Sequence, residues 1–330
     1  MSEILEHGQF LGIPQCSGAP DIVIVPLAYE LTTSYGTGAC DGPKACIEAS
    51  TQVELYDDRL GYDLPGAYGM KTLPAWVGQA PTLRGQLDEM VDFVSPCFDG
   101  EHFPIFLGGE HGILPPLIRA ARLHPLVDGD LSKLSVVQLD AHADLREDLD
   151  GEIFSHACAA SRALDVGIGA LYQAGIRAYS KEEAQRIEDD AKITTFFARQ
   201  TQHPTKGPAV WREWIETLQK IRGPVHLTID IDGLDGALVP ATGTPVPGGL
   251  TFWQAVETIE TLFENPHAFV ISADVNEIVP QAATPLTQFT AACLVSRVIA
   301  SHIFARENGR WKSLEKGHLE ADLSSYFSQF

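Results

Sequence analysis

Short runs of β-branched and other apolar residues alternate along this chain with longer stretches in which apolar residues recur every three to four positions. The short runs predict strands at Ile22–Leu27, Ile105–Leu107, Leu134–Leu139, Ala174–Ala178, Val225–Ile229 and Phe269–Ala273. The longer stretches predict helices at Pro43–Tyr56, Leu83–Phe93, Pro115–Leu123, Lys181–Asp189, Val210–Ile221, Phe252–Phe263 and Leu286–Ala305. Strands that alternate with helices indicate an α/β fold, and we expect a three-layer αβα sandwich around a central, mostly parallel sheet.

No break in composition, repeat or low-complexity segment divides the chain. The glycines and prolines between Thr242 and Gly249 are typical of an ordered loop rather than of a linker. Since α/β domains often reach this size, we expect a single domain over residues 1–330.

The charge balance of the chain limits its partners. Apolar residues make up 45% of the sequence, which is enough for a packed core. The 44 acidic residues against 23 basic ones leave a net charge of −21, which disfavours nucleic acid and anionic membranes as partners. A small cationic ligand is favoured instead.

The sequence predicts a cytoplasmic protein. Its first residues lack the basic segment and apolar run of a secretory signal, and no stretch of about 18 apolar residues predicts a membrane span. The six cysteines are scattered without a C-x-x-C pair, which is typical of a reducing compartment. We expect each of them to be a small core residue.

Polar side chains follow four of the predicted strands. Asp140, Asp230 and Asp274 come directly after apolar runs, and the run at Ile105–Leu107 is followed by Gly108-Gly109-Glu110-His111. Ligands of open α/β sheets bind beyond the carboxyl ends of the strands. We therefore expect these four segments to form one site.

Two of the segments carry side chains that suit metal ions. Asp140, His142 and Asp144 are spaced so that an extended chain points them to one side, and Asp230 and Asp232 repeat the spacing. A single acid at the end of a strand is usually a cap or turn residue, but burying this many together is costly without a cation. With the histidine that follows the Gly-Gly turn, the candidate ligands are His111, Asp140, His142, Asp144, Asp230 and Asp232.

The composition of this ligand set favours two divalent ions. Four carboxylates can bridge metals, and their charge of −4 balances two divalent cations. An oxygen-rich set with one imidazole per metal fits manganese, while nickel, iron and zinc remain alternatives.

Four segments together resemble the signature motifs of the arginase/agmatinase (ureohydrolase) family. They are Gly108-Gly109-Glu110-His111, Asp140-Ala141-His142-Ala143-Asp144, Asp230-Ile231-Asp232-Gly233-Leu234-Asp235 and Asp274-Val275-Asn276-Glu277, in the family order. The stretch from Thr33 to Ser50 is also similar to the family's N-terminal loop and first helix, so the resemblance spans about residues 20–305. It implies the arginase-like fold and a homo-oligomer, either a hexamer or a trimer.

Carried over position by position, the resemblance implies two metal sites and a catalytic pair. One metal would be held by His111, Asp140, Asp144 and Asp230, and the other by Asp140, His142, Asp230 and Asp232. Glu277 would bind the guanidinium of the substrate, and His156 would contact the substrate and transfer a proton. Asp144 would also orient the attacking hydroxide, which two metals generate by lowering the pKa of water from 15.7 to about 7.

The resemblance implies a hydrolase that cleaves a guanidino compound to urea and an amine. The Asp-Leu-Arg pattern at Asp144, followed by Ser155-His156-Ala157, is more similar to bacterial and archaeal agmatinases than to arginases. Agmatine, a dication, also suits the net charge better than arginine does. The expected reaction is agmatine to putrescine and urea, a step of polyamine biosynthesis.

Other activities remain open. Within the family they are hydrolysis of arginine, guanidinobutyrate, guanidinopropionate, formiminoglutamate or free guanidine. A deacetylase-like enzyme with one zinc is disfavoured because His111 and Asp144 complete a second site. A catalytically inactive regulatory homologue is disfavoured because no ligand is missing.

The chain departs from the family pattern at a few places. Glu110 stands where many relatives have Asp, and Gly112 where they have Ser or Thr. Asp235 is followed by Gly236 instead of proline, and the segment from Gly36 to Cys40 lacks the usual arginines. None of these is a predicted ligand.

Overall fold

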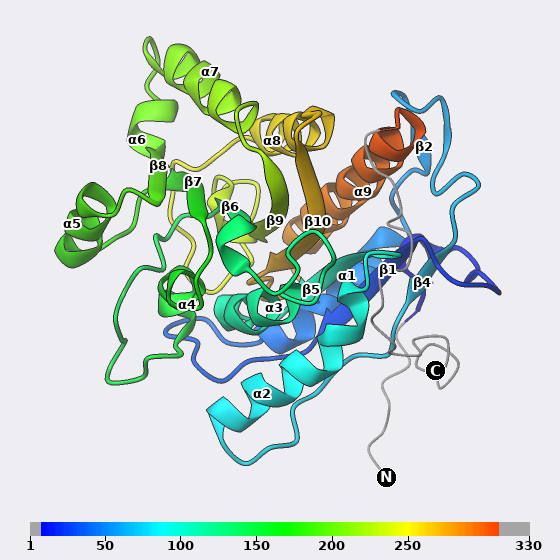
Figure 1. Cartoon of the computed structure of the whole chain (residues 1–330), viewed down its shortest axis with the longest axis horizontal. Helices are drawn as coiled ribbons and strands as arrows, with labels where there is room; N and C mark the ends of the chain where they lie inside the picture. The colour runs from blue at the N-terminus through cyan, green and yellow to red at the C-terminus, as the bar shows by residue number, and fades with distance from the viewer. Residues whose placement is uncertain (1–7, 310–330) are drawn as a thin grey trace.

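The sheet expected from the sequence is present and entirely parallel. The structure is a computed structural model that describes residues 8–309, and its central sheet has eight strands in the order β4-β1-β5-β10-β9-β6-β7-β8 (Figure 1). The strands are β1 (Ile22–Leu27), β4 (Met70–Thr72), β5 (Phe103–Gly108), β6 (Ser135–Leu139), β7 (Ala170–Ile176), β8 (Ile193–Phe197), β9 (Gly223–Asp230) and β10 (Ala268–Asn276). A short antiparallel pair, β2 (Tyr56–Asp57) and β3 (Tyr62–Asp63), lies apart from it.

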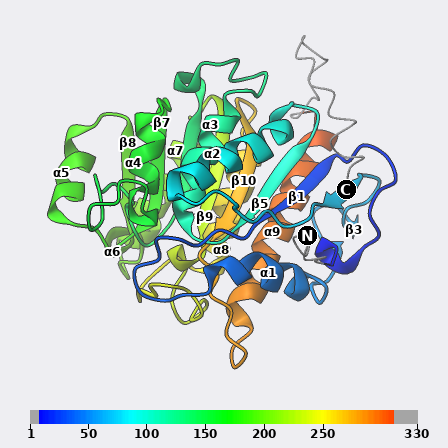
Figure 2. The same ribbon diagram turned by 90° about the horizontal axis from the view of Figure 1, so that it is seen from below.

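Helices cover both faces of the sheet (Figure 2). They are α1 (Gly42–Ser50), α2 (Leu83–Val94), α3 (Leu114–Ala121), α4 (Ala159–Asp165), α5 (Lys181–Asp189), α6 (Ala198–Thr201), α7 (Gly207–Leu218), α8 (Phe252–Glu264) and α9 (Leu286–Glu307). One apolar cluster packs the sheet against α1, α7, α8 and α9, and the other packs it against α2, α3 and α4. Within β1, Ile22 and Ile24 face the first cluster while Val23 and Val25 face the second, as the alternation of a strand requires. The α/β class and the three-layer arrangement are confirmed.

The sequence placed most central elements correctly and missed edge elements. The helix at Lys181–Asp189 has the predicted bounds, but α1 ends at Ser50 instead of Tyr56. The strand expected at Ala174–Ala178 begins earlier, at Ala170, because the buried Gln173 interrupts its apolar run. The edge strands β4 and β8 and the helix α4 were not predicted, since they are short or rich in Thr, Ala and Ser.

The long helix α9 is a core element of the fold. Within residues 8–309 it is the one helix long and apolar enough to cross a membrane, with a mean hydropathy of 1.3. However, 72% of its apolar window is buried inside the protein. A helix that is apolar on most sides and buried is typical of the core of a large domain.

The order of the strands explains why the predicted site is compact. The four strands that precede the polar motifs are β5, β10, β9 and β6, and they are consecutive neighbours in the sheet. All four run parallel, so their carboxyl ends meet at one edge. The fold therefore brings together segments that lie up to about 170 residues apart in the chain.

Candidate metal centre

The six predicted ligands form one cluster at the carboxyl edge of the sheet. They are His111 after β5, Asp140, His142 and Asp144 after β6, Asp230 at the end of β9 and Asp232 just after it. The four carboxylates and His111 are at most 5% exposed, whereas His142 is half-buried.

The contacts divide the cluster into two groups that share Asp140. Nδ1 of His111 lies 3.1 Å from Oδ2 of Asp140 and 2.9 Å from Oδ2 of Asp144. Oδ2 of Asp230 lies 3.7 Å from the same nitrogen. In the second group, Nδ1 of His142 is 3.0 Å from Oδ2 of Asp232 and 3.7 Å from Oδ1 of Asp140. One carboxylate that reaches both groups can bridge two ions.

The hydrogen bond made by Nε2 of His111 indicates that its other ring nitrogen, Nδ1, faces a cation. The Thr228 hydroxyl donates to Oδ1 of Asp274 at 2.7 Å, so its oxygen is free to accept from Nε2 of His111 at 2.8 Å. A proton on Nε2 leaves a lone pair on Nδ1, which points at three carboxylates. Acceptors that converge on one point in a buried site fit a metal ion.

The charge of the cluster supports the same conclusion. Burial and then the charge of Asp140 raise the pKa of Asp144 to about 6. Burial and the nearby carboxylates of Asp232 and Asp140 raise the pKa of Asp230 well above its usual value. Two divalent cations bound here would offset the negative charge of all four carboxylates.

A buried polar network supports the outer nitrogen of His111. Asp274 accepts hydrogen bonds from Thr228, from Nε2 of His226 at 2.6 Å and from the side chain of Asn276. Asp274 is therefore a supporting residue and not a ligand. Asp274 was noted in the sequence analysis as an acid that follows a strand. His226 and Thr228 were not noted, although both are polar residues within the apolar run that leads to Asp230.

A second network supports Asp140 from inside the sheet. Nε2 of Gln138 donates to Oδ2 of Asp140 at 2.7 Å, and Nε2 of Gln173 donates to the Gln138 oxygen at 2.9 Å. Thr195 donates in turn to Gln173 at 2.9 Å. These residues are paired in register across β6, β7 and β8, so the chain of hydrogen bonds crosses three strands. Sequence reasoning missed it because pairing between strands is a tertiary feature.

His156 and Glu277 lie beside the cluster. Nδ1 of His156 is 3.0 Å from Oε1 of Glu277, and the backbone N–H of His111 donates to the same oxygen at 2.8 Å. Burial disfavours a charged His156, but the hydrogen bond to Glu277 and its charge outweigh this and raise the pKa of His156 to about 9. All eight residues singled out from the sequence therefore lie in one region.

Asp144 and Glu277 both have left-handed backbone conformations, with φ of 54° and 63°. Such conformations cost of the order of 1–3 kcal/mol in residues other than glycine and concentrate at functional sites. The strain fixes the direction in which each carboxylate leaves the backbone.

The loops that depart from the family pattern are held by other contacts. The Asp235 carboxylate accepts from the backbone N–H groups of Gly248 and Gly249, which closes the loop after β9. The Arg177 guanidinium donates to the carbonyl of Asp232 at 2.7 Å. In the N-terminal loop, the Glu30 carboxylate accepts from the backbone of Gly38 and Cys40.

The acids that follow Asp144 mostly have local partners. Glu147 pairs with Arg162 and Arg186, at 3.3 and 3.1 Å. Asp148 accepts from the backbone N–H of Gly151, and Glu152 from that of Phe154. Ion pairs and backbone hydrogen bonds therefore engage these three acids locally.

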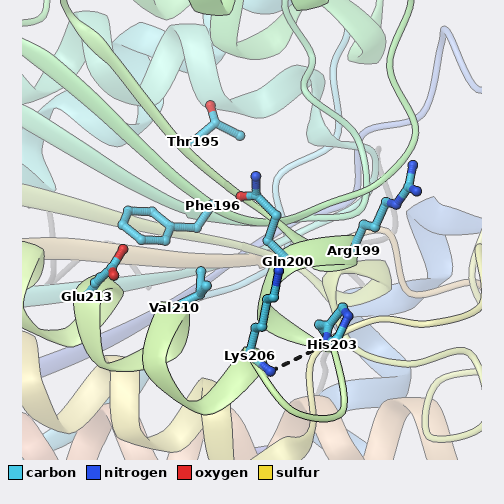
Figure 3. Close-up of a pocket in the computed structure, with 8 residues that line it drawn as sticks. All are labelled: Thr195, Phe196, Arg199, Gln200, His203, Lys206, Val210 and Glu213. Carbon is cyan, nitrogen blue, oxygen red and sulfur yellow. Dashed lines mark hydrogen bonds between the residues drawn. The ribbon is translucent and has the colours of Figure 1, made fainter.

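A separate cavity lies between β8 and α7 (Figure 3). Its volume is about 650 Å³, and it is lined by Thr195, Phe196, Arg199, Gln200, His203, Lys206, Val210 and Glu213. Figure 3 shows the side chains of Arg199 and Glu213 on opposite sides of it. None of its lining residues belongs to the metal cluster, and its charged groups do not converge, so we assign no chemistry to it.

Comparison with known proteins gives one consistent result. The model of the Arginase family matches residues 20–301. The chain is 35% identical to the N(1)-aminopropylagmatine ureohydrolase of Synechocystis sp., over 84% of this chain and 88% of that protein. It is 32% identical to the agmatinase of Pyrococcus horikoshii, over 84% and 91% of the two chains. The crystal structure of the agmatine ureohydrolase of Thermoplasma volcanium superposes with a TM-score of 0.74 at 28% identity and covers 87% of this chain and 92% of that one.

Proposed function

The chain belongs to the arginase family, and we propose that its metal centre hydrolyses agmatine to urea and putrescine. Its relatives are ureohydrolases, so the coarser activity is that of a hydrolase acting on amidino carbon–nitrogen bonds. The observation that carries the proposal is the position of the His156–Glu277 pair beside a buried cluster of four carboxylates and two imidazoles.

The chemistry needs a nucleophile stronger than water, because a guanidinium is resonance-stabilised and always charged. The six ligands would hold two divalent cations, which would supply Lewis acidity and lower the pKa of a nearby water toward neutral pH. We infer manganese from the oxygen-rich ligands.

Three residues of this chain carry the remaining roles. Glu277 binds the guanidinium and offsets its charge. Asp144 accepts a hydrogen bond from the attacking oxygen and so directs it at the guanidinium carbon. The new C–O bond forms first; when the C–N bond to the alkyl chain then breaks, His156 gives its proton to the departing amine, and Asp144 takes the proton left on the added oxygen, so that the products are urea and the amine.

The charge state of His156 suits this donor role. A pKa of about 9 keeps the imidazolium populated at neutral pH. Cations held by the six ligands would lower that pKa, and a proton donor works best when its pKa is near the operating pH.

A second candidate substrate is N(1)-aminopropylagmatine. It is supported by the relative from Synechocystis sp., which bears this activity in its name and is 35% identical to the chain. The two substrates share the guanidino end, so the residues described above act in the same way on either. A longer polycation also suits the net charge of −21.

The free cysteines support the proposal of a cytoplasmic location. All six lie in the described part of the chain and none forms a disulfide. Reduced cysteines are the usual state in the cytosol.

The proposal is tested by kcat/KM for agmatine, N(1)-aminopropylagmatine, arginine and 4-guanidinobutyrate under identical manganese loading and salt. Agmatine should be preferred over arginine by orders of magnitude, because an added carboxylate needs its own partner. Preference for arginine or 4-guanidinobutyrate would contradict the proposed substrate. Preference for N(1)-aminopropylagmatine would select the second candidate.

A further inference from the structure

Glu110 is a fully buried carboxylate next to the ligand His111, and the hydrogen bonds that its carboxylate accepts come from the N-terminal loop. Its Oε2 accepts from the backbone N–H groups of Leu31 and Thr32 at 3.0 and 2.7 Å. Its Oε1 accepts from the Thr32 hydroxyl at 2.6 Å. The carboxylate therefore ties the N-terminal loop to the start of the first metal motif.

The Thr32 hydroxyl connects Glu110 to His156. Because its proton is donated to Glu110, the Thr32 oxygen is free to accept from the backbone N–H of His156, at 2.8 Å. The side chain of His156 in turn meets Glu277. A continuous chain of hydrogen bonds thus runs from Glu110 through Thr32 to the backbone of the proposed proton donor.

Gly112 makes room for this arrangement. A Cβ atom at residue 112 would lie 2.9 Å from Oε1 of Glu110 and 3.1 Å from the Tyr29 ring. The carboxylate cannot move aside cheaply, because three hydrogen bonds hold it. Two of the departures noted in the sequence, Glu110 and Gly112, therefore belong to one structural feature.

We propose that Glu110 and Thr32 are positioning residues that set the place of His156, and that Gly112 is required for Glu110 to do so. This inference rests on the proposed role of His156 as the proton donor. None of these hydrogen bonds involves the side chain of a proposed metal ligand, so the proposal predicts a change in turnover without a change in metal content.

The test compares Thr32→Val with Thr32→Ser. Valine keeps the shape of threonine and removes the hydroxyl, whereas serine keeps the hydroxyl. Three quantities are measured in each variant: metal content, kcat and KM with agmatine, and hydrogen exchange of the His156 backbone amide followed by mass spectrometry.

In Thr32→Val the His156 amide should exchange faster because its acceptor is gone, and kcat should fall about 10- to 100-fold, the scale expected for a displacement near 1 Å. KM should stay within about threefold and metal content should not change. Thr32→Ser should resemble the wild type. Unchanged exchange, or faster exchange with wild-type kcat, would overturn the positioning role.

Gly112→Ala tests the same chain of hydrogen bonds from its other end. It should also lower kcat and speed exchange at His156, but it should add little when combined with Thr32→Val, because the connection is then already broken. Fully additive effects of the two changes on kcat would contradict the proposal.

His156→Ala distinguishes this inference from the function on which it rests. Wild-type kcat in His156→Ala would overturn the proposed proton donor. A defective His156→Ala beside a Thr32→Val of wild-type kcat would overturn the positioning role alone.

Discussion

Thr228 connects His111 to Asp274, and its hydroxyl should control how tightly the first metal is held. Thr228→Val keeps the branched shape of the side chain and removes both of its hydrogen bonds. Asp274 retains His226 and Asn276 as partners. The main loss therefore falls on Nε2 of His111, which is left without an acceptor in a buried site.

The size of the effect follows from this geometry. An unsatisfied buried donor costs about 1–3 kcal/mol, and removing the outer partner of a metal-bound histidine typically weakens metal binding about 10- to 100-fold. We expect weaker metal binding of that order in Thr228→Val and a loss of about 1–3 kcal/mol in the free energy of unfolding.

Two assays measure these losses. Competition with a chromophoric chelator gives the metal affinity, and urea unfolding gives the stability. Thr228→Ser is the matched control, because it keeps the hydroxyl and should hold metal almost as well as the wild type. Equal metal affinity in Thr228→Val and Thr228→Ser would refute the proposed role of the hydroxyl.

Three further predictions follow from the site. Metal affinity should fall as pH drops through about 6, because Asp144, whose pKa is raised to about 6, then takes up a proton that competes with the cation. A constant affinity in a chelator titration between about pH 5 and 7.5 would contradict this. Gln138→Leu should lower metal affinity or turnover by removing the donor to Asp140, whereas Gln219→Leu, at an exposed position, should change neither. Chelator competition and kcat measure both quantities, and equal values in the two variants would exclude a role for the buried amide. Light scattering should show a hexamer or trimer, and a monomer at assay concentration would contradict the proposed homo-oligomer.

The sequence predicted those features whose signal is local. The apolar runs located the central strands, and a parallel sheet requires that polar residues after its strands meet at one edge. Asp140, His142 and Asp144 were recognisable because their spacing is repeated by Asp230 and Asp232. The edge strands β4 and β8 lacked such a signal, since a short strand at the edge of a sheet need not be strongly apolar.

The supporting residues could not be predicted because their partners are distant in the chain. In the sequence, Gln173 interrupts the apolar run of a strand. Only its hydrogen bond to Gln138 explains a buried amide at that position. In the sequence, Glu110 and Gly112 are two separate departures from a family pattern. The structure shows that the Glu110 carboxylate lies against the position that a side chain at residue 112 would occupy. Sequence spacing indicates which residues can act together, whereas contacts between strands and loops decide what holds them in place.

The central claim is that two metal ions, held by one cluster in which Asp140 reaches both groups of ligands, carry the activity. The most direct test is to titrate metal-depleted protein with manganese while following bound metal by elemental analysis and hydrolysis of agmatine by urea release. Activity should appear as the content approaches two ions per chain, and Asp230→Asn should lose both metal and activity. A fully active protein that holds only one tightly bound ion would contradict the account.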